Sequence, residues 1–262
     1  MPPPMEPVHK LLITGTGRAG TTFLVQLFTE LGLDTGYAPG TASRDYFDHC
    51  SAGLEQAIGT EASPYIVKNP AFCDTLPTLI ATERFKIDHV LVPVRQLDEA
   101  AKSRIRVGGR DGLVPGGLLG TADPAAQKGV LAERFHGLMH ALAAHDIPHT
   151  LLCFPRLALD ADYAWVKLRF LMPTVERPAF AEVFRRLSRP ELIHRFGDVP
   201  ADPGRSAEEF LRAERRKRSR RRAKRLVAAL AIAAAGVLAV RIYVERSREM
   251  PTLESRLSNA GH

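Results

Sequence analysis

The chain has only three cysteines in 262 residues, Cys50, Cys73 and Cys153, and no two of them form a C-x-x-C pair. Disulfide frameworks need several paired cysteines, and cysteine zinc sites need close spacing. The sequence therefore argues against both, and we expect free thiols in a reducing compartment. His136 and His140 lie four residues apart, but the Glu of the zinc-protease motif is missing between them, so we predict no metal site.

A secretory signal is also missing. Residues 1–5 contain three prolines and lack the basic and then apolar pattern that directs export. We therefore expect the folded domain to remain in the cytoplasm.

The positive charge of the chain is concentrated in one segment. The formal net charge is +7, yet residues 212–225 hold ten Lys or Arg and one Glu, which leaves −2 for the remainder. A globally basic face is thus not implied, although a basic arm binds nucleic acid nonspecifically. We predict no specific nucleic-acid partner.

An uncharged stretch follows this basic segment directly. Residues 226–240 contain no charge and seven Leu, Ile or Val. As a helix, residues 226–244 rise roughly 28 Å, close to the ~30 Å of a bilayer core. We predict a linker (198–205), then one long helix with a basic juxtamembrane part (206–225) and a transmembrane part (226–244), and a short tail (245–262). The basic flank would stay cytoplasmic. A packed Ala-rich helix in a soluble protein is the alternative.

Four strand-like apolar runs alternate with helical patterns in the first part of the chain, at 10–14, 64–67, 87–94 and 149–154. This order predicts an α/β fold over residues 1–197, with a mostly parallel sheet and helices on both faces. Residues 108–120 are rich in glycine. We expect either a loop that closes over a substrate or a connection with no role.

Residues 15–22, Gly-Thr-Gly-Arg-Ala-Gly-Thr-Thr, stand between an apolar run and a helical pattern. Glycines let backbone N–H groups converge on an anion at a helix N-terminus, so a phosphate-bearing ligand is expected. The loop also fits the dinucleotide fingerprint, with Asp34 near the position of its acid, although the run before Asp34 is too short for a buried strand. It fits the Walker glycines as well, but Thr21 stands where that loop has its Lys.

A second cluster follows the run at 87–94, where Arg95 comes directly after the strand and Ser103 eight residues later. With these residues, the chain resembles the sulfotransferase family, especially bacterial members, weakly beyond Ser103. The resemblance covers roughly residues 9–195 and implies 3′-phosphoadenosine 5′-phosphosulfate as donor, with no metal. It assigns the 5′-phosphosulfate to Gly17, Arg18, Ala19, Gly20, Thr21 and Thr22, and the 3′-phosphate to Arg95 and Ser103.

The acceptor side is less specific. Sulfotransferases commonly have a Lys at the end of the next strand, where Lys68 stands, and the resemblance implies that Lys68 stabilises the transferring group. Asn69 cannot act as a base. Residues 44–49 are similar to the acceptor-facing segment of some bacterial members, where an acid is the base, and this resemblance makes Asp45 the preferred general base and His49 the second choice. A solvated loop is the alternative for this segment. The resemblance implies as acceptor a hydroxyl or an amine on a small molecule, a glycan or a lipid.

Two other functions remain open at the level of sequence. One is a P-loop phosphotransferase that acts on a nucleotide or a small molecule. The other is a membrane scaffold without catalytic activity, whose basic arm holds anionic lipids.

Overall fold

The computed structural model describes residues 6–41, 46–47, 52–58, 63–108 and 116–193. All of them belong to the first of two compact units, residues 1–209. The predicted linker, long C-terminal helix and tail (198–262) lie outside the described part, as do Asp45 and His49. Within the described residues, no helix has the length and apolarity needed to span a membrane.

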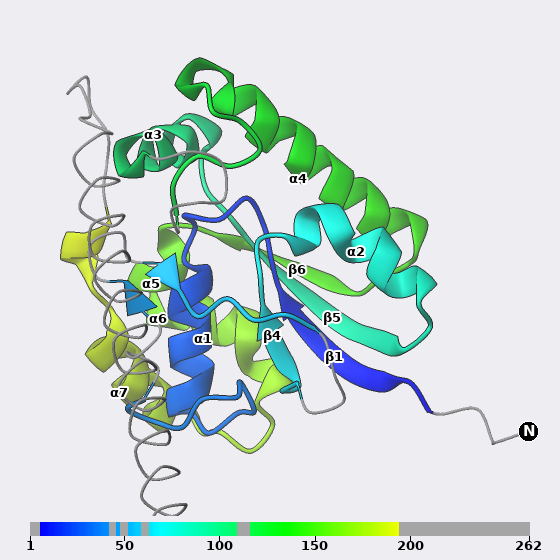
Figure 1. Cartoon of the computed structure of the whole chain (residues 1–262). Helices are drawn as coiled ribbons and strands as arrows, with labels where there is room; N and C mark the ends of the chain where they lie inside the picture. Colours follow the sequence, from blue (N-terminus) through cyan, green and yellow to red (C-terminus); the bar gives the residue numbers. More distant parts are fainter. Residues whose placement is uncertain (1–5, 42–45, 48–51, 59–62, 109–115, 194–262) are drawn as a thin grey trace, which may run out of the picture. The chain divides into compact units, whose positions relative to one another are not determined.

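Four strands form one parallel sheet in the order β4-β1-β5-β6 (Figure 1). Their bounds are Val8–Ile13 for β1, Ile66–Lys68 for β4, Phe85–Val94 for β5 and His149–Cys153 for β6. Each predicted strand is present, which confirms the α/β fold with a mostly parallel sheet. A separate antiparallel pair consists of β2 (Tyr46–Phe47) and β3 (Ala52–Gly53).

β1 begins two residues before its predicted start, so that Lys10 lies in mid-strand. The side chain of Lys10 is 1% exposed, and its Nζ donates hydrogen bonds to the backbone oxygens of Ser63 (2.6 Å) and Pro64 (2.9 Å). A buried ammonium is tolerated only when it is hydrogen-bonded. These bonds also hold the start of β4 beside β1.

Helices cover both faces of the sheet (Figure 1). One face is packed by α1 (Thr21–Glu30), α6 (Ala161–Leu168) and α7 (Arg177–Leu187). The other is packed by α2 (Phe72–Ala81) and α4 (Gln127–Ala144), with α3 (Leu97–Val107) beside α4. The short elements are α5 (Arg156–Leu159), η2 (Pro124–Ala126), η3 (Arg169–Leu171) and η4 (Pro190–Leu192). The two-faced arrangement explains why the strands read as continuous apolar runs.

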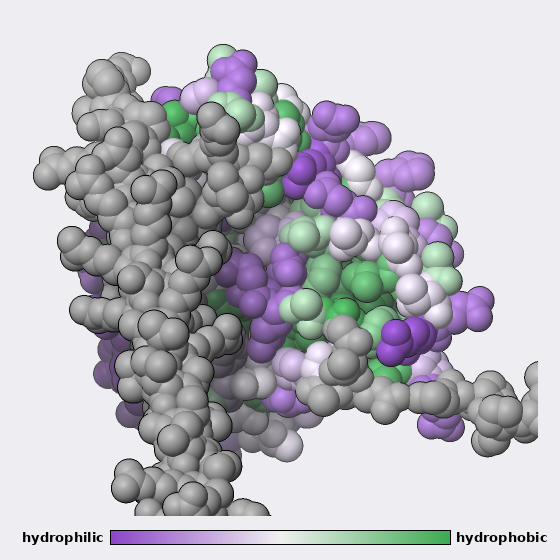
Figure 2. Space-filling view, viewed as in Figure 1, coloured by the Kyte–Doolittle hydropathy of each residue, from purple (hydrophilic) through white to green (hydrophobic). Residues whose placement is uncertain are grey.

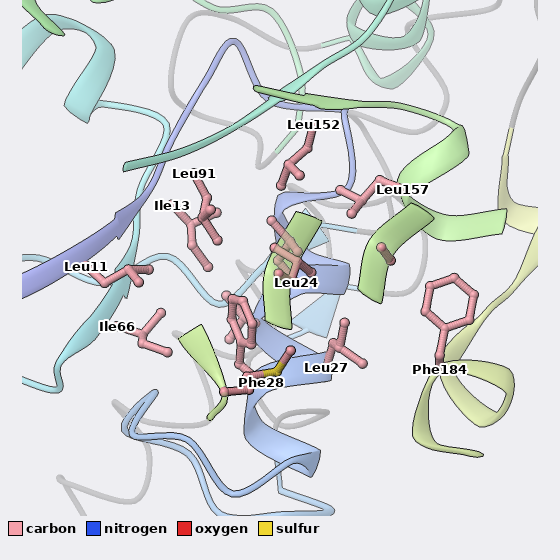
Figure 3. Packing of buried hydrophobic residues seen from close by; sticks show 14 of the residues in the cluster. Leu11, Ile13, Leu24, Leu27, Phe28, Ile66, Leu91, Leu152, Leu157 and Phe184 are labelled. Carbon is pink, nitrogen blue, oxygen red and sulfur yellow. The ribbon is translucent and has the colours of Figure 1, made fainter. Parts of the chain in front are cut away.

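Alternate residues of β1 face opposite helical layers. Leu11 and Ile13 pack with Leu24 and Phe28 of α1, as Figure 3 shows. Leu12, between them in sequence, packs in the other cluster with residues of α2 and α4. This alternation is the two-residue period of a strand. It fixes α1, and therefore the loop that precedes it, against one face of the sheet.

The surface of the described unit mixes polar and apolar areas. On the face shown in Figure 2, a hydrophobic area has hydrophilic side chains around it. The strongly basic segment, residues 212–225, lies outside the described part.

Candidate active site

The carboxyl ends of all four sheet strands meet at one cavity of about 790 Å³. Its wall includes Gly17 after β1, Lys68 at the end of β4, Arg95 after β5 and Phe154 after β6. Ligands of open parallel sheets bind at this edge, and cavities of this size accommodate nucleotide-sized molecules. The topology thus brings together residues that the sequence separates by up to 137 positions.

The loop after β1 has the backbone of an anion-binding turn. Gly17 and Gly20 have φ angles of 71° and 88°, and Arg18 between them has a φ of 57°. A positive φ is uncommon for a residue with a side chain and marks local strain, often at functional sites. A Cβ added to Gly17 would lie 2.4 Å from Arg104 Nη2, and one added to Gly20 would lie 3.1 Å from the Phe154 ring. The positive φ and these close neighbours together make a side chain unfavourable at both positions.

Gly20 is the N-cap of α1, so the first N–H groups of the helix lack partners within the helix. Thr21 and Thr22 are buried and also line the cavity. Five of the six loop residues predicted to bind the donor therefore reach the cavity, while Ala19 is fully buried and is not part of the described wall. The helix dipole favours a negative charge at this point.

The two predicted motifs are in direct contact. Arg18 Nε donates a hydrogen bond to Ser103 Oγ of α3 (3.0 Å), and Arg95 Nη1 donates to the backbone oxygen of Arg18 (3.2 Å). Ser103 is 1% exposed and stands outside the described cavity wall, so it reaches the cavity through Arg18. Loop, strand end and helix form one connected structure.

Arg95 is itself largely buried. Its side chain is 7% exposed, lies 5.2 Å from the centre of the Phe154 ring and forms an ion pair with Glu99 (3.4 Å). Burial lowers the pKa of Arg95, and Glu99 opposes that effect. Because the Arg95 side chain is already held in place, it loses little conformational entropy when it binds an anion.

Lys68 lies at the floor of the cavity with an acidic partner. It is 2% exposed, donates to the backbone oxygen of Gly53 (2.7 Å) and forms an ion pair with Glu55. Burial lowers the pKa of Lys68, while Glu55 raises it. The side chain of Glu55 is 34% exposed and lines the cavity. Glu55 is therefore an acid beside Lys68 in the cavity wall, and the sequence analysis did not identify it.

Asn69 has a structural role beside this pair. Its Nδ2 donates to the backbone oxygen of Gln56 (3.0 Å), and its Oδ1 accepts from Ala71 N (2.9 Å) just before α2. Both ends of the amide are therefore engaged in holding the chain after β4.

Arg104 is a second residue that the sequence analysis missed. It is 4% exposed, follows Ser103 on α3 and lies in the cavity wall against the glycine loop. Only a weak sign of this role is present in the sequence, because α3 carries other basic residues and nothing local distinguishes Arg104 from them.

The charge of the cavity wall is positive, and part of the wall is apolar. Its cationic side chains are those of Arg18, Lys68, Arg95, Arg104, Arg134 and Arg189. Its acids are Glu55 and Glu191, and its apolar side chains include Phe23, Phe154, Ala158, Leu187, Leu192 and Ile193. Such a wall suits an anionic ligand that also carries an apolar ring.

The acid of the dinucleotide alternative lies at the opposite edge of the sheet. Asp34 Oδ2 accepts a hydrogen bond from Tyr65 N (2.7 Å), directly before β4 begins. Because β4 and β1 are parallel, this is the edge away from the glycine loop. Asp34 thus organises the start of β4 rather than a ribose at the cavity.

Metal ligands do not cluster in the part of the chain that the structure describes, where no group of three His, Cys, Asp or Glu is close enough to hold an ion. His136 and His140 both lie exposed on α4.

In comparisons with protein-family models and with curated proteins, no match to this chain is found.

Proposed function

We propose that the chain is a sulfotransferase that binds 3′-phosphoadenosine 5′-phosphosulfate and transfers its sulfuryl group to a hydroxyl or an amine. The observation that carries this proposal is the contact between the loop of residues 17–22 and Arg95 at one cavity. A donor with phosphate on both sides of one ribose needs two anion sites close together. The N-terminus of α1 suits the 5′ group, and Arg95 suits the 3′ group.

The apolar part of the wall supports a nucleoside between these sites. Phe154 follows β6, the neighbour of β5, and its ring already lies near the Arg95 guanidinium. An aromatic ring beside a cation suits a base whose sugar carries the phosphate.

The transfer needs positioning and charge stabilisation more than covalent chemistry. The acceptor oxygen or nitrogen forms a bond to sulfur, and the bond from sulfur to the 5′-phosphate oxygen breaks. The acceptor proton passes to the Glu55 carboxylate, and adenosine 3′,5′-bisphosphate leaves. We assign the base to Glu55 rather than Asp45, because Glu55 lines the cavity and contacts Lys68.

In this mechanism Lys68 has two tasks. Its ammonium holds the Glu55 carboxylate in place and stabilises the negative charge that develops on the transferring group. Arg18 and the loop N–H groups stabilise the departing phosphate.

A phosphotransferase is the competing proposal, and nucleotide selectivity separates the two. We expect titration calorimetry of the full chain to give tighter binding of adenosine 3′,5′-bisphosphate than of ATP or NAD, because Thr21 replaces the lysine that reaches a γ-phosphate. Preference for ATP would favour the phosphotransferase, and no nucleotide binding would favour a scaffold without activity.

We also propose that residues 226–244 anchor the chain in a membrane, with the basic segment 206–225 on the cytoplasmic side. This proposal depends on sequence alone: a segment of spanning length, whose single charged residue is Arg241 near one end, next to dense positive charge. It would bring the enzyme to lipid or glycan acceptors at the membrane surface.

A further inference from the structure

Arg104 joins the glycine loop to a distant segment of the chain. Its Nε donates to the backbone oxygen of Thr16 (3.0 Å), as does Nη2, and its Nη1 donates to the backbone oxygen of Gly117 (2.6 Å). Gln127, also fully buried, holds the next part of that segment through the backbone N and O of Leu119. Arg104 is thus fixed from two sides within the cavity wall.

Among the described residues, no acid contacts the Arg104 guanidinium. Its hydrogen bonds within the described residues all go to carbonyl oxygens. Burial, reinforced by the nearby charges of Arg18 and Arg134, lowers its pKa to about 9, whereas Glu55 acts in the opposite direction through space. Buried charges are normally paired, so an anion that entered the cavity would stabilise a guanidinium in this setting.

The close contact between Arg104 and the loop depends on the glycine at position 17. A side chain at this position would place a Cβ 2.4 Å from Arg104 Nη2, closer than any atoms tolerate. The glycine therefore lets the guanidinium lie directly against the loop. The loop N–H groups and Arg104 share the same cavity.

We propose that Arg104 binds the anion held by the glycine loop, and that it supplies from α3 the cation that a Walker loop takes from its own lysine. The added charge makes the site prefer an anion with two joined charged centres, such as a diphosphate or a phosphosulfate, over a single phosphate. The inference rests on the proposed anion site at the loop, but it holds for either a sulfuryl or a phosphoryl donor.

Inorganic pyrophosphate and inorganic phosphate test this inference by calorimetry on the full chain. We expect the wild-type protein to bind pyrophosphate about tenfold more tightly than phosphate, and Arg104→Gln to lower the pyrophosphate affinity about tenfold, since a charge-assisted hydrogen bond is lost. Arg106→Gln is the matched control, because Arg106 is exposed on the same helix. The pyrophosphate affinity of this variant should stay within about twofold of that of the wild type.

Arg104→Gln that folds and binds pyrophosphate like the wild type would overturn the inference, while the bisphosphate preference of the wild type would still support the proposed function. A wild-type chain that binds no pyrophosphate would overturn both.

If Arg104→Gln does not fold, a measurement on the wild-type protein tests the same inference. The Nε–H signal of Arg104 in an NMR spectrum, assigned by its loss in Arg104→Lys or by through-space contacts to the loop, should shift on saturation with pyrophosphate. A signal that does not move would overturn the inference.

Discussion

Arg18 Nε donates a hydrogen bond to Ser103 Oγ at 3.0 Å, across 85 residues of sequence. The bond joins the glycine loop after β1 to the helix after β5, and Arg95 adds a second link through the Arg18 backbone oxygen. The two predicted anion-binding segments are therefore in direct contact. In the proposed enzyme, Ser103 positions Arg18 for the phosphosulfate.

Replacement of Ser103 tests this positioning. Ser103→Ala removes the acceptor for Arg18 Nε, so we expect adenosine 3′,5′-bisphosphate to bind about fivefold more weakly, the usual consequence of one lost hydrogen bond. Calorimetry on the purified variant provides the measurement. Lys102→Ala, at the exposed neighbouring position, serves as control. Unchanged affinity in Ser103→Ala would mean that Arg18 holds its position without this bond.

Glu55→Gln tests the assignment of the base. With any acceptor that supports turnover, we expect kcat to fall about 100-fold or more, because the amide cannot take the acceptor proton. Donor affinity should stay within about threefold, since Glu55 is not part of the donor sites. Glu182→Gln, exposed on α7, should leave both quantities unchanged. Full activity of Glu55→Gln at saturating acceptor would return the role to Asp45 or to no base at all.

The two cysteines within the described residues should differ in reactivity. Cys73 is 5% exposed, and burial raises the pKa of its thiol, whereas Cys153 is exposed on β6. The thiolate is the reactive species, so a raised pKa leaves less of it at neutral pH. Iodoacetamide followed by peptide mass spectrometry should label Cys153 at least about tenfold faster than Cys73. Equal rates would contradict the packing of α2 against the sheet.

The membrane anchor is tested by fractionation in salt and carbonate. We expect the full chain to stay with membranes in both, because burial of apolar residues does not weaken as ions screen charge. A shortened chain that ends at Asp198 should be soluble and still bind the bisphosphate. Release of the full chain by salt alone would indicate attachment by the basic segment 206–225 instead.

Local patterns in the sequence were sufficient to predict the strands of the sheet and the position of the glycine loop. The strands are continuous apolar runs because helices cover both faces, and the glycine loop between Ile13 and Thr21 has a local pattern. The bounds of all four strands were off by one or two residues, and at β4 the residue missed at the end of the strand is the buried Lys68. Hydropathy gives no sign that such an ammonium finds buried acceptors.

The missed residues depend on contacts that no local pattern encodes. Arg104 meets Thr16 across 88 residues, and Glu55 meets Lys68 only because the segment after β3 returns to the end of β4. Within residues 108–120, predicted as either a closing loop or a connection with no role, Arg104 holds Gly117 and Gln127 holds Leu119. Gly116, Leu118 and Leu119 line the cavity. The assignments at Asp45 and at residues 198–262 lie outside the described residues and stay predictions.

Comparison of adenosine 3′,5′-bisphosphate with AMP by titration calorimetry tests the central claim most directly. The two nucleotides differ only in the 3′-phosphate, so any difference in affinity reports a second anion site. We predict at least about tenfold tighter binding of the bisphosphate by the full chain, and loss of that preference in Arg95→Ala, where the buried guanidinium is removed. Equal affinity of the wild type for both nucleotides would contradict the proposed donor.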